Sequence, residues 1–114
     1  YKKIVYKIKK KQIFNNLHNT NEVFIFCYSK FTMPTITFFK KNKNKIKGII
    51  DDNVNLKGKY FQGIKIINSK TFLKKKNKKT LCIVANHREV TLQKIYKQLK
   101  RGGLKHNQIL LLKY

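Results

Sequence analysis

Five short runs of apolar, β-forming residues limit most strongly what this chain can fold into. The runs span residues 22–28, 45–50, 64–67, 80–85 and 108–112. Their nearly continuous hydrophobicity is typical of strands that are buried on both faces, as in a parallel sheet. Strands that alternate with helices form βαβ units with right-handed crossovers. The pattern therefore predicts an α/β fold, with helices layered on both faces of a short parallel sheet of about five strands.

Helical signals fall in three of the segments between these runs. Pro34 suits the first turn of a helix that continues to Lys41. Ser69 is a candidate N-cap for a short helix, which a basic loop follows. Residues 87–100 predict the longest helix of this domain, and Gly102 would end it. Four apolar side chains of that helix share one face: Leu92, Ile95, Tyr96 and Leu99.

A lysine-rich stretch precedes the first strand. Apolar side chains in residues 1–18 recur at roughly helical spacing, which predicts a basic amphipathic helix lying on the protein surface or on a membrane surface. We therefore divide the chain into a basic helix and linker over 1–20 and one α/β domain over 21–114. Because no apolar stretch is as long as a membrane span, we expect a cytoplasmic protein. The chain starts with Tyr and ends within an apolar run, so we also expect a fragment of a longer chain.

The formal net charge of +24 is extreme for a globular domain, and it has two interpretations. Lysine supplies nearly all of it, and lysine, asparagine and isoleucine are the residues that an AT-rich coding sequence would favour. Proteins selected to bind phosphates usually recruit arginine, whose guanidinium forms paired hydrogen bonds, yet this chain has only two. The charge therefore reflects either nucleotide composition or a dedicated role in binding polyanions.

The sequence lacks the usual arrangements of catalytic and metal-binding residues. Cys27 and Cys82 lie in apolar runs without ligand spacing, so we expect two buried free thiols. The three histidines, His18, His87 and His106, share no recognisable spacing. Paired carboxylates and Ser/His/Asp arrangements are also missing, so we predict no catalytic residue and no metal site in this segment.

Polar residues follow the predicted strands, at the edge where an open parallel sheet binds its ligand. They predict a ligand site formed by Tyr28, Ser29, Lys30, Asp51, Asp52, Asn53, Asn86, His87 and Arg88, with Asn68 and Ser69 nearby. Asp51 lies at about the spacing that binds ribose hydroxyls, although a hydrogen-bonded turn is the alternative. The turn after the first strand has side chains where a dinucleotide site needs glycine. We therefore predict that this segment binds no NAD, FAD or S-adenosylmethionine, and we assign no cofactor.

Three stretches resemble a small Rossmann-like domain of bacterial sugar and surface-polysaccharide enzymes. They read VFIFCYSKF, KIKGIIDDNVNLKGKYFQGIKIINSKTFL and TLCIVANHREVTLQKIYKQL. The middle stretch is similar to the C-terminal domain of sugar C-methyltransferases and to the N-terminal domain of sugar acyltransferases and some nucleotide-sugar epimerases. The resemblance covers about four-fifths of the chain. It implies an accessory domain that helps to hold a nucleotide sugar at the polar strand ends, with the catalytic domain elsewhere in a longer chain.

Two functional hypotheses follow. The first is a nucleotide-sugar-binding or structural accessory domain of a methyltransferase-like or acyltransferase-like enzyme, in which Lys30 and Arg88 contact the phosphates. The second is a small RNA-binding protein, such as an organellar ribosomal component, that neutralises phosphates through its basic runs. Order and spacing across several segments favour the first hypothesis, whereas composition alone could produce the charge.

Overall fold

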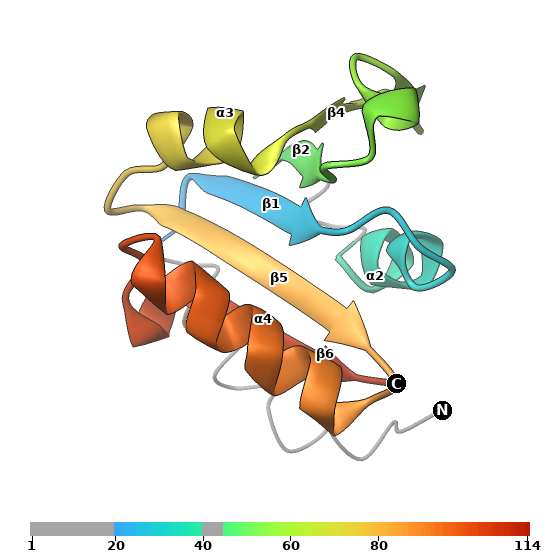
Figure 1. Ribbon diagram of the computed structural model, residues 1–114. Helices are drawn as coiled ribbons and strands as arrows, with labels where there is room; N and C mark the ends of the chain where they lie inside the picture. Colours follow the sequence, from blue (N-terminus) through green and yellow to red (C-terminus); the bar gives the residue numbers. More distant parts are fainter. Residues whose placement is uncertain (1–19, 40–44) are drawn as a thin grey trace.

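The protein forms a six-stranded mixed sheet with helices on both faces (Figure 1). The computed structural model describes residues 20–39 and 45–114, so the basic helix predicted over 1–18 lies outside the described residues. The sheet order is β3-β4-β2-β1-β5-β6. The strands are β1 Glu22–Phe26, β2 Ile46–Ile50, β3 Tyr60–Phe61, β4 Ile64–Ile67, β5 Thr80–Asn86 and β6 Ile109–Lys113.

All five strands predicted from the apolar runs are present and pair in parallel. In chain order they occupy positions 3-2-1-4-5 across the sheet, which is the order of a doubly wound Rossmann-like fold. The predicted α/β fold class is therefore confirmed. The order reverses between β1 and β5, so this pair marks the switch point where such sheets place their ligands.

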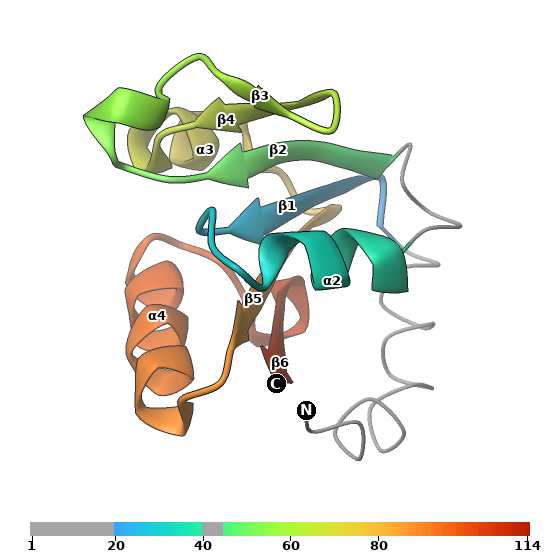
Figure 2. The ribbon, with the colours of Figure 1, turned by 90° about the vertical axis from the view of Figure 1, so that its right-hand side faces the viewer.

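The one described strand that was not predicted, β3, lies between residues 50 and 64, a segment without a strand or helix signal. It pairs antiparallel with β4 through a tight turn, in which Gln62 and Gly63 have φ of 53° and 78°. Two successive positive φ angles are typical of a type I′ hairpin turn. A strand of two residues is too short to show a hydrophobic period, so no sequence pattern predicts it. The hairpin stands beyond β4 at one edge of the sheet (Figure 2).

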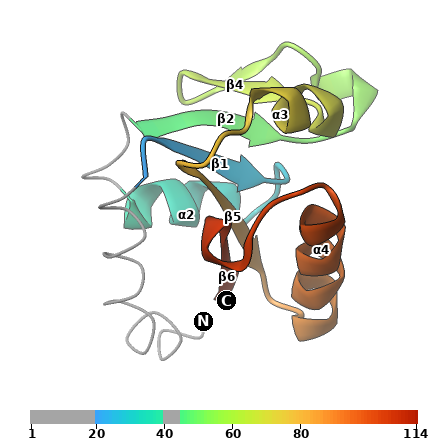
Figure 3. The same cartoon turned by 90° about the vertical axis from the view of Figure 1, so that its left-hand side faces the viewer.

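The helices lie on opposite faces according to the direction in which the chain crosses the sheet. Helix α2, Thr32–Phe38, connects β1 to β2 and covers one face. Helices α3, Ser69–Lys75, and α4, Glu89–Arg101, follow the chain back across the sheet and cover the other face (Figure 3). Right-handed crossovers require this change of face when the direction reverses. Short 3-10 turns, η2 Val54–Leu56 and η3 His106–Gln108, complete the described elements.

Each face of the sheet buries its own hydrophobic cluster. Side chains alternate along β1, so that Val23 and Ile25 enter the cluster beneath α2, whereas Phe24 enters the cluster beneath α3 and α4. Phe24 meets Phe72 of α3 edge to face, with ring centroids 5.0 Å apart. Gly48 makes room for this pair, because a Cβ there would lie 3.1 Å from the Phe24 ring. The two clusters together fix the position of the strand ends.

Helix boundaries differ from the sequence prediction at specific caps. Asn68, not Ser69, caps α3, and its side-chain oxygen accepts a 2.8 Å hydrogen bond from the Thr71 amide. Helix α4 begins at Glu89, two residues later than predicted, and ends at Arg101 with Gly102 as its C-cap, as expected. Helix α2 ends at Phe38, and the lysines predicted to extend it, Lys40 and Lys41, lie outside the described residues. No helix in the described part of the chain has the length and hydrophobicity needed to cross a membrane.

Candidate functional site

The turn between β1 and α2 leaves the sheet through a left-handed residue, Cys27, whose φ is 76°. The Cys27 amide donates a 2.6 Å hydrogen bond to the Ile50 carbonyl, which holds the turn against the end of β2. The side chain of Cys27 is exposed, so the prediction of a buried thiol is wrong at this position. Strand β1 ends at Phe26, and the backbone changes direction at Cys27. The side chain of Cys27 therefore does not follow the alternating burial of the strand. Cys82 lies inside β5 and is buried, as predicted.

Side-chain oxygens of the protein accept hydrogen bonds from three amides of the β1–α2 turn. The Tyr28 amide donates to Asp51 Oδ2 at 2.9 Å, and the Ser29 amide donates to Thr32 Oγ1 at 2.8 Å. The Phe31 amide donates to Ser29 Oγ at 3.1 Å. A glycine-rich turn leaves such amides free to bind a diphosphate. Three amides of this turn are instead bonded within the protein, so a ligand at the strand ends would be held mainly by side chains.

The two aspartates that follow β2 connect it to its neighbours. Asp51 Oδ1 accepts from the Asn53 amide at 2.9 Å, in addition to the bond from Tyr28. Asp52 accepts from both the amide and the hydroxyl of Ser69, each at 2.7 Å. These contacts match the turn interpretation of the aspartate pair. Because a carboxylate has about four lone-pair sites, both aspartates keep capacity to accept bonds from ligand hydroxyls.

Asn53 and Asn86 shape the backbone where β2 and β5 end. The side-chain oxygen of Asn53 accepts from the Asn55 amide at 3.0 Å, which starts the η2 turn. The side-chain oxygen of Asn86 accepts from the Arg88 amide at 2.9 Å, and its carbonyl accepts from the Tyr114 amide at 2.9 Å. Arg88 itself is exposed. Both asparagines therefore have a local structural role at the positions predicted for ligand binding.

Phe31 brings together two of the predicted site residues. The Lys30 ammonium lies 5.3 Å from the centroid of the Phe31 ring, and the His87 ring lies 5.5 Å from it. Tyr114 stacks on the same ring with centroids 5.1 Å apart. No sequence pattern predicts this cluster, because its members come from three distant segments. The side chain of Tyr28, in contrast, packs against Phe61 of β3, with ring centroids 5.1 Å apart.

A buried hydrogen bond fixes the base of this aromatic cluster. Thr35 Oγ1 donates to the Phe31 carbonyl at 2.7 Å, so the 3.0 Å bond between Thr35 and Tyr114 is donated by the tyrosine hydroxyl. Both side chains are buried. The contact joins α2 to the end of β6, and a separation of 79 residues leaves no trace in local sequence spacing.

The described residues contain no group of three histidine, cysteine, aspartate or glutamate side chains that could hold a metal ion. His87 is at the β5 end, whereas His106 accepts or donates a 2.8 Å hydrogen bond with the Tyr96 hydroxyl beside η3. His18 lies outside the described residues. The arrangement at the strand ends can bind charged and hydroxylated groups, and it positions no nucleophile against a base.

The two thiols are expected to differ in reactivity. Complete burial raises the pKa of Cys82 far above its ordinary value. Desolvation by neighbouring atoms, followed by the carboxylates of Asp51 and Asp52, also raises the pKa of Cys27. At about pH 8 iodoacetamide should therefore alkylate exposed Cys27 more slowly than the same cysteine in the unfolded chain, and Cys82 not at all. Peptide mass spectrometry over a time course measures both rates.

The substitution Asp52→Asn removes one cause of the raised Cys27 pKa, so it is expected to accelerate alkylation of Cys27. Glu89→Gln is the control, because it removes the same charge from the start of α4. Equal acceleration by both variants would show that the net charge alone sets the reactivity. Alkylation of Cys82 as fast as that of Cys27 in the folded protein would contradict the observed burial.

No protein-family model and no curated protein matches the sequence. Among solved structures, the chain is similar to RSP, a Rex-family repressor, with a TM-score of 0.60 and 17% sequence identity. The fold is Rossmann-like. The similarity covers 91% of this chain and 60% of the repressor chain, so this chain spans about three-fifths of the length of that protein. At this identity, the likeness extends to the fold alone.

Proposed function

We propose that the Rossmann-like domain is a non-catalytic accessory domain that binds a nucleotide sugar, or a related diphosphate, at the carboxyl edge of its sheet. It would serve a larger cytoplasmic sugar-modifying enzyme, as the resemblance of its strand-end motifs implies. The observation that carries the proposal is the division of this edge into a basic part and an acidic part. Lys30 and Arg88 flank the switch point, while Asp51 and Asp52 follow β2.

The two parts complement the two ends of such a ligand. Ammonium and guanidinium groups form charge-assisted hydrogen bonds with phosphate oxygens, and carboxylates accept bonds from sugar hydroxyls. Because three amides of the β1–α2 turn are already bonded within the protein, the diphosphate would be held mainly by the side chains of Lys30 and Arg88. The net charge of +24 would attract the anionic ligand from a distance.

Calorimetric titration of the 114-residue chain with UDP-glucose tests the proposal. We expect saturable binding that persists at about 0.15 M salt, where charges separated by more than about 8 Å are screened. The double variant Lys30→Gln/Arg88→Gln is expected to lose about ten- to a hundredfold in affinity, because it removes two charge-assisted contacts.

The control Lys97→Gln/Arg101→Gln removes the same charge from α4, where both side chains are exposed away from the strand ends. It is expected to change the affinity by less than about threefold. No heat with UDP-glucose would contradict the proposed function. Tight binding of an unrelated RNA that collapses with salt, without a response to UDP-glucose, would favour the RNA-binding hypothesis.

A further inference from the structure

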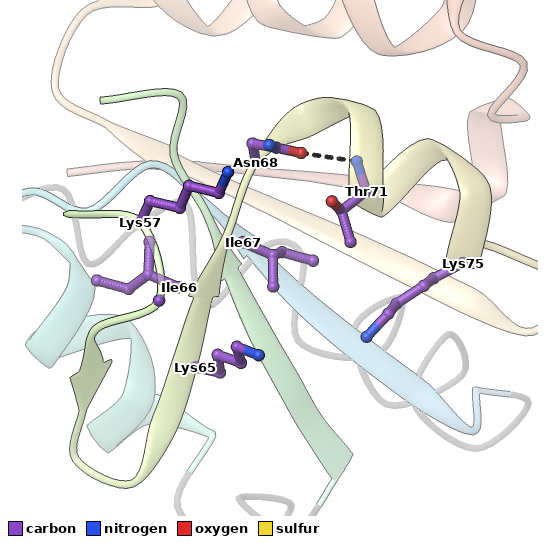
Figure 4. Close-up of a pocket in the computed structure, with 8 residues that line it drawn as sticks. Lys57, Lys65, Ile66, Ile67, Asn68, Thr71 and Lys75 are labelled. Atoms are coloured by element: carbon purple, nitrogen blue, oxygen red, sulfur yellow. Dashed lines mark hydrogen bonds between the residues drawn. The ribbon is translucent and has the colours of Figure 1, made fainter. Parts of the chain in front are cut away.

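A second candidate site lies beside β4, away from the switch point between β1 and β5. A pocket of about 180 Å³ opens between β4, the start and end of α3, and the loop after η2 (Figure 4). Its lining includes Lys57, Lys65 and Lys75 together with Asn68 and Thr71. Of these residues only Asn68 was predicted near the ligand site at the strand ends, and the three lysines are not part of that site. Figure 4 shows the ammonium groups of Lys65 and Lys75 pointing into the space between them, with Lys57 pointing toward Asn68.

Three separate elements bring the lysines to this pocket. Lys57 follows η2, Lys65 lies within β4, and Lys75 ends α3. The loop that carries Lys57 is held against the strand by a 2.8 Å hydrogen bond from the Ile66 amide to the Lys59 carbonyl. The Asn68 cap fixes the start of α3 on the opposite side. The backbone that presents the three lysines is therefore held by bonds that do not involve their charges.

No carboxylate lines the pocket. All four acidic side chains of the chain have partners elsewhere. Asp51 and Asp52 bind amides and a hydroxyl beyond β2 and at Ser69. Glu22 accepts from the Asn77 side chain, and Glu89 pairs with Lys113 at 3.9 Å. Lys65 and Lys75 thus point into the same space with Lys57 at its edge, and no carboxylate lies among them to offset the repulsion between like charges.

We propose that this pocket binds a single phosphate monoester group. A dianion between Lys65 and Lys75 would offset their repulsion, and Lys57, the amide hydrogens of the Asn68 side chain and the Thr71 hydroxyl line the same pocket as further donors. The pocket volume of about 180 Å³ is smaller than the roughly 300–1,000 Å³ typical of sites for whole drug-sized ligands. It suits one phosphate group, with the remainder of the molecule in solvent. The proposal goes beyond the function assigned to the strand ends and does not depend on it.

Amide-resolved NMR titration of the full chain with inorganic phosphate, and then with ribose 5-phosphate, tests this site. We expect saturable shifts of the Ile66, Asn68 and Thr71 amides for both probes. The triple variant Lys57→Gln/Lys65→Gln/Lys75→Gln is expected to lose at least tenfold in affinity for phosphate. All three side chains are exposed, so the variant is expected to fold.

The control triple Lys70→Gln/Lys74→Gln/Lys78→Gln removes the same charge from exposed positions that do not line the pocket. It should keep the affinity within threefold of the parent chain. Equal losses in both triples, or shifts that do not saturate, would overturn the proposal. A short single-stranded oligonucleotide that shifts the same amides more tightly than ribose 5-phosphate would also overturn it, because the site would then read nucleic-acid phosphates. Shifts at Asp51 and His87 report the other site, so the two proposals can fail separately.

Discussion

Replacing Phe72 with alanine is expected to lower the free energy of unfolding by about 3–5 kcal/mol, the usual cost of emptying a buried phenylalanine site. Phe72 is 1% exposed and joins α3 to β1 through the edge-to-face contact with Phe24. Its neighbours on the sheet are fixed by strand pairing, so the cavity can collapse only in part. Because a domain of this size is stable by about 5–15 kcal/mol, the loss would be a large fraction of the total. Thermal and urea unfolding measure it.

Leu73→Ala is the matched control on the same helix. Leu73 is 38% exposed, so its truncation is expected to cost about 1 kcal/mol or less. A Phe72→Ala protein as stable as the Leu73→Ala protein would contradict the packing of Phe72 in the hydrophobic cluster beneath α3 and α4. It would mean that α3 is not packed on the sheet as the Phe24 contact requires.

The five parallel strands were predictable because most of their residues are apolar and contribute to the clusters on the two faces of the sheet. Residues 64–67 and 80–85 are nearly continuous hydrophobic runs, and a parallel sheet is the simplest structure that buries them. Right-handed crossovers made the fold class predictable. The 3-2-1-4-5 strand order was not predictable, because no run of residues specifies which strand lies beside which. The β3 hairpin was missed because two residues carry no period. The exposure of Cys27 was missed because sequence does not show at which residue a strand turns away.

The candidate site was predictable as a location and not as a set of contacts. Polar residues after apolar runs must gather at one edge of a parallel sheet, and the observed order places them there. Sequence could not show that Asp51 and Asp52 already accept bonds from Tyr28, Asn53 and Ser69. Those bonds span up to 23 residues and depend on where the β1–α2 turn folds. The Phe31 cluster depends similarly on the meeting of three distant segments.

The substitution Asp51→Ala is expected to destabilise the protein by about 2 kcal/mol, because Asp51 accepts two charge-assisted hydrogen bonds from backbone amides. One of them holds the β1–α2 turn to the end of β2, so the loss should be largest there. Hydrogen exchange at the Tyr28 amide is expected to accelerate more than exchange within β5. The change also raises the net charge from +24 to +25, which adds self-repulsion that salt can screen.

Added salt separates these two causes. Salt should restore the part of the loss due to repulsion, whereas the part due to the missing hydrogen bonds should remain at about 0.5 M salt. Asp52→Ala makes the same change in charge and removes the bonds to Ser69, so it should loosen the start of α3 and leave the Tyr28 amide protected. If Asp51→Ala weakened UDP-glucose binding with no change in stability or exchange, Asp51 would act on the ligand directly. If stability and binding fell together, the carboxylate would act first by holding the turn that presents Lys30.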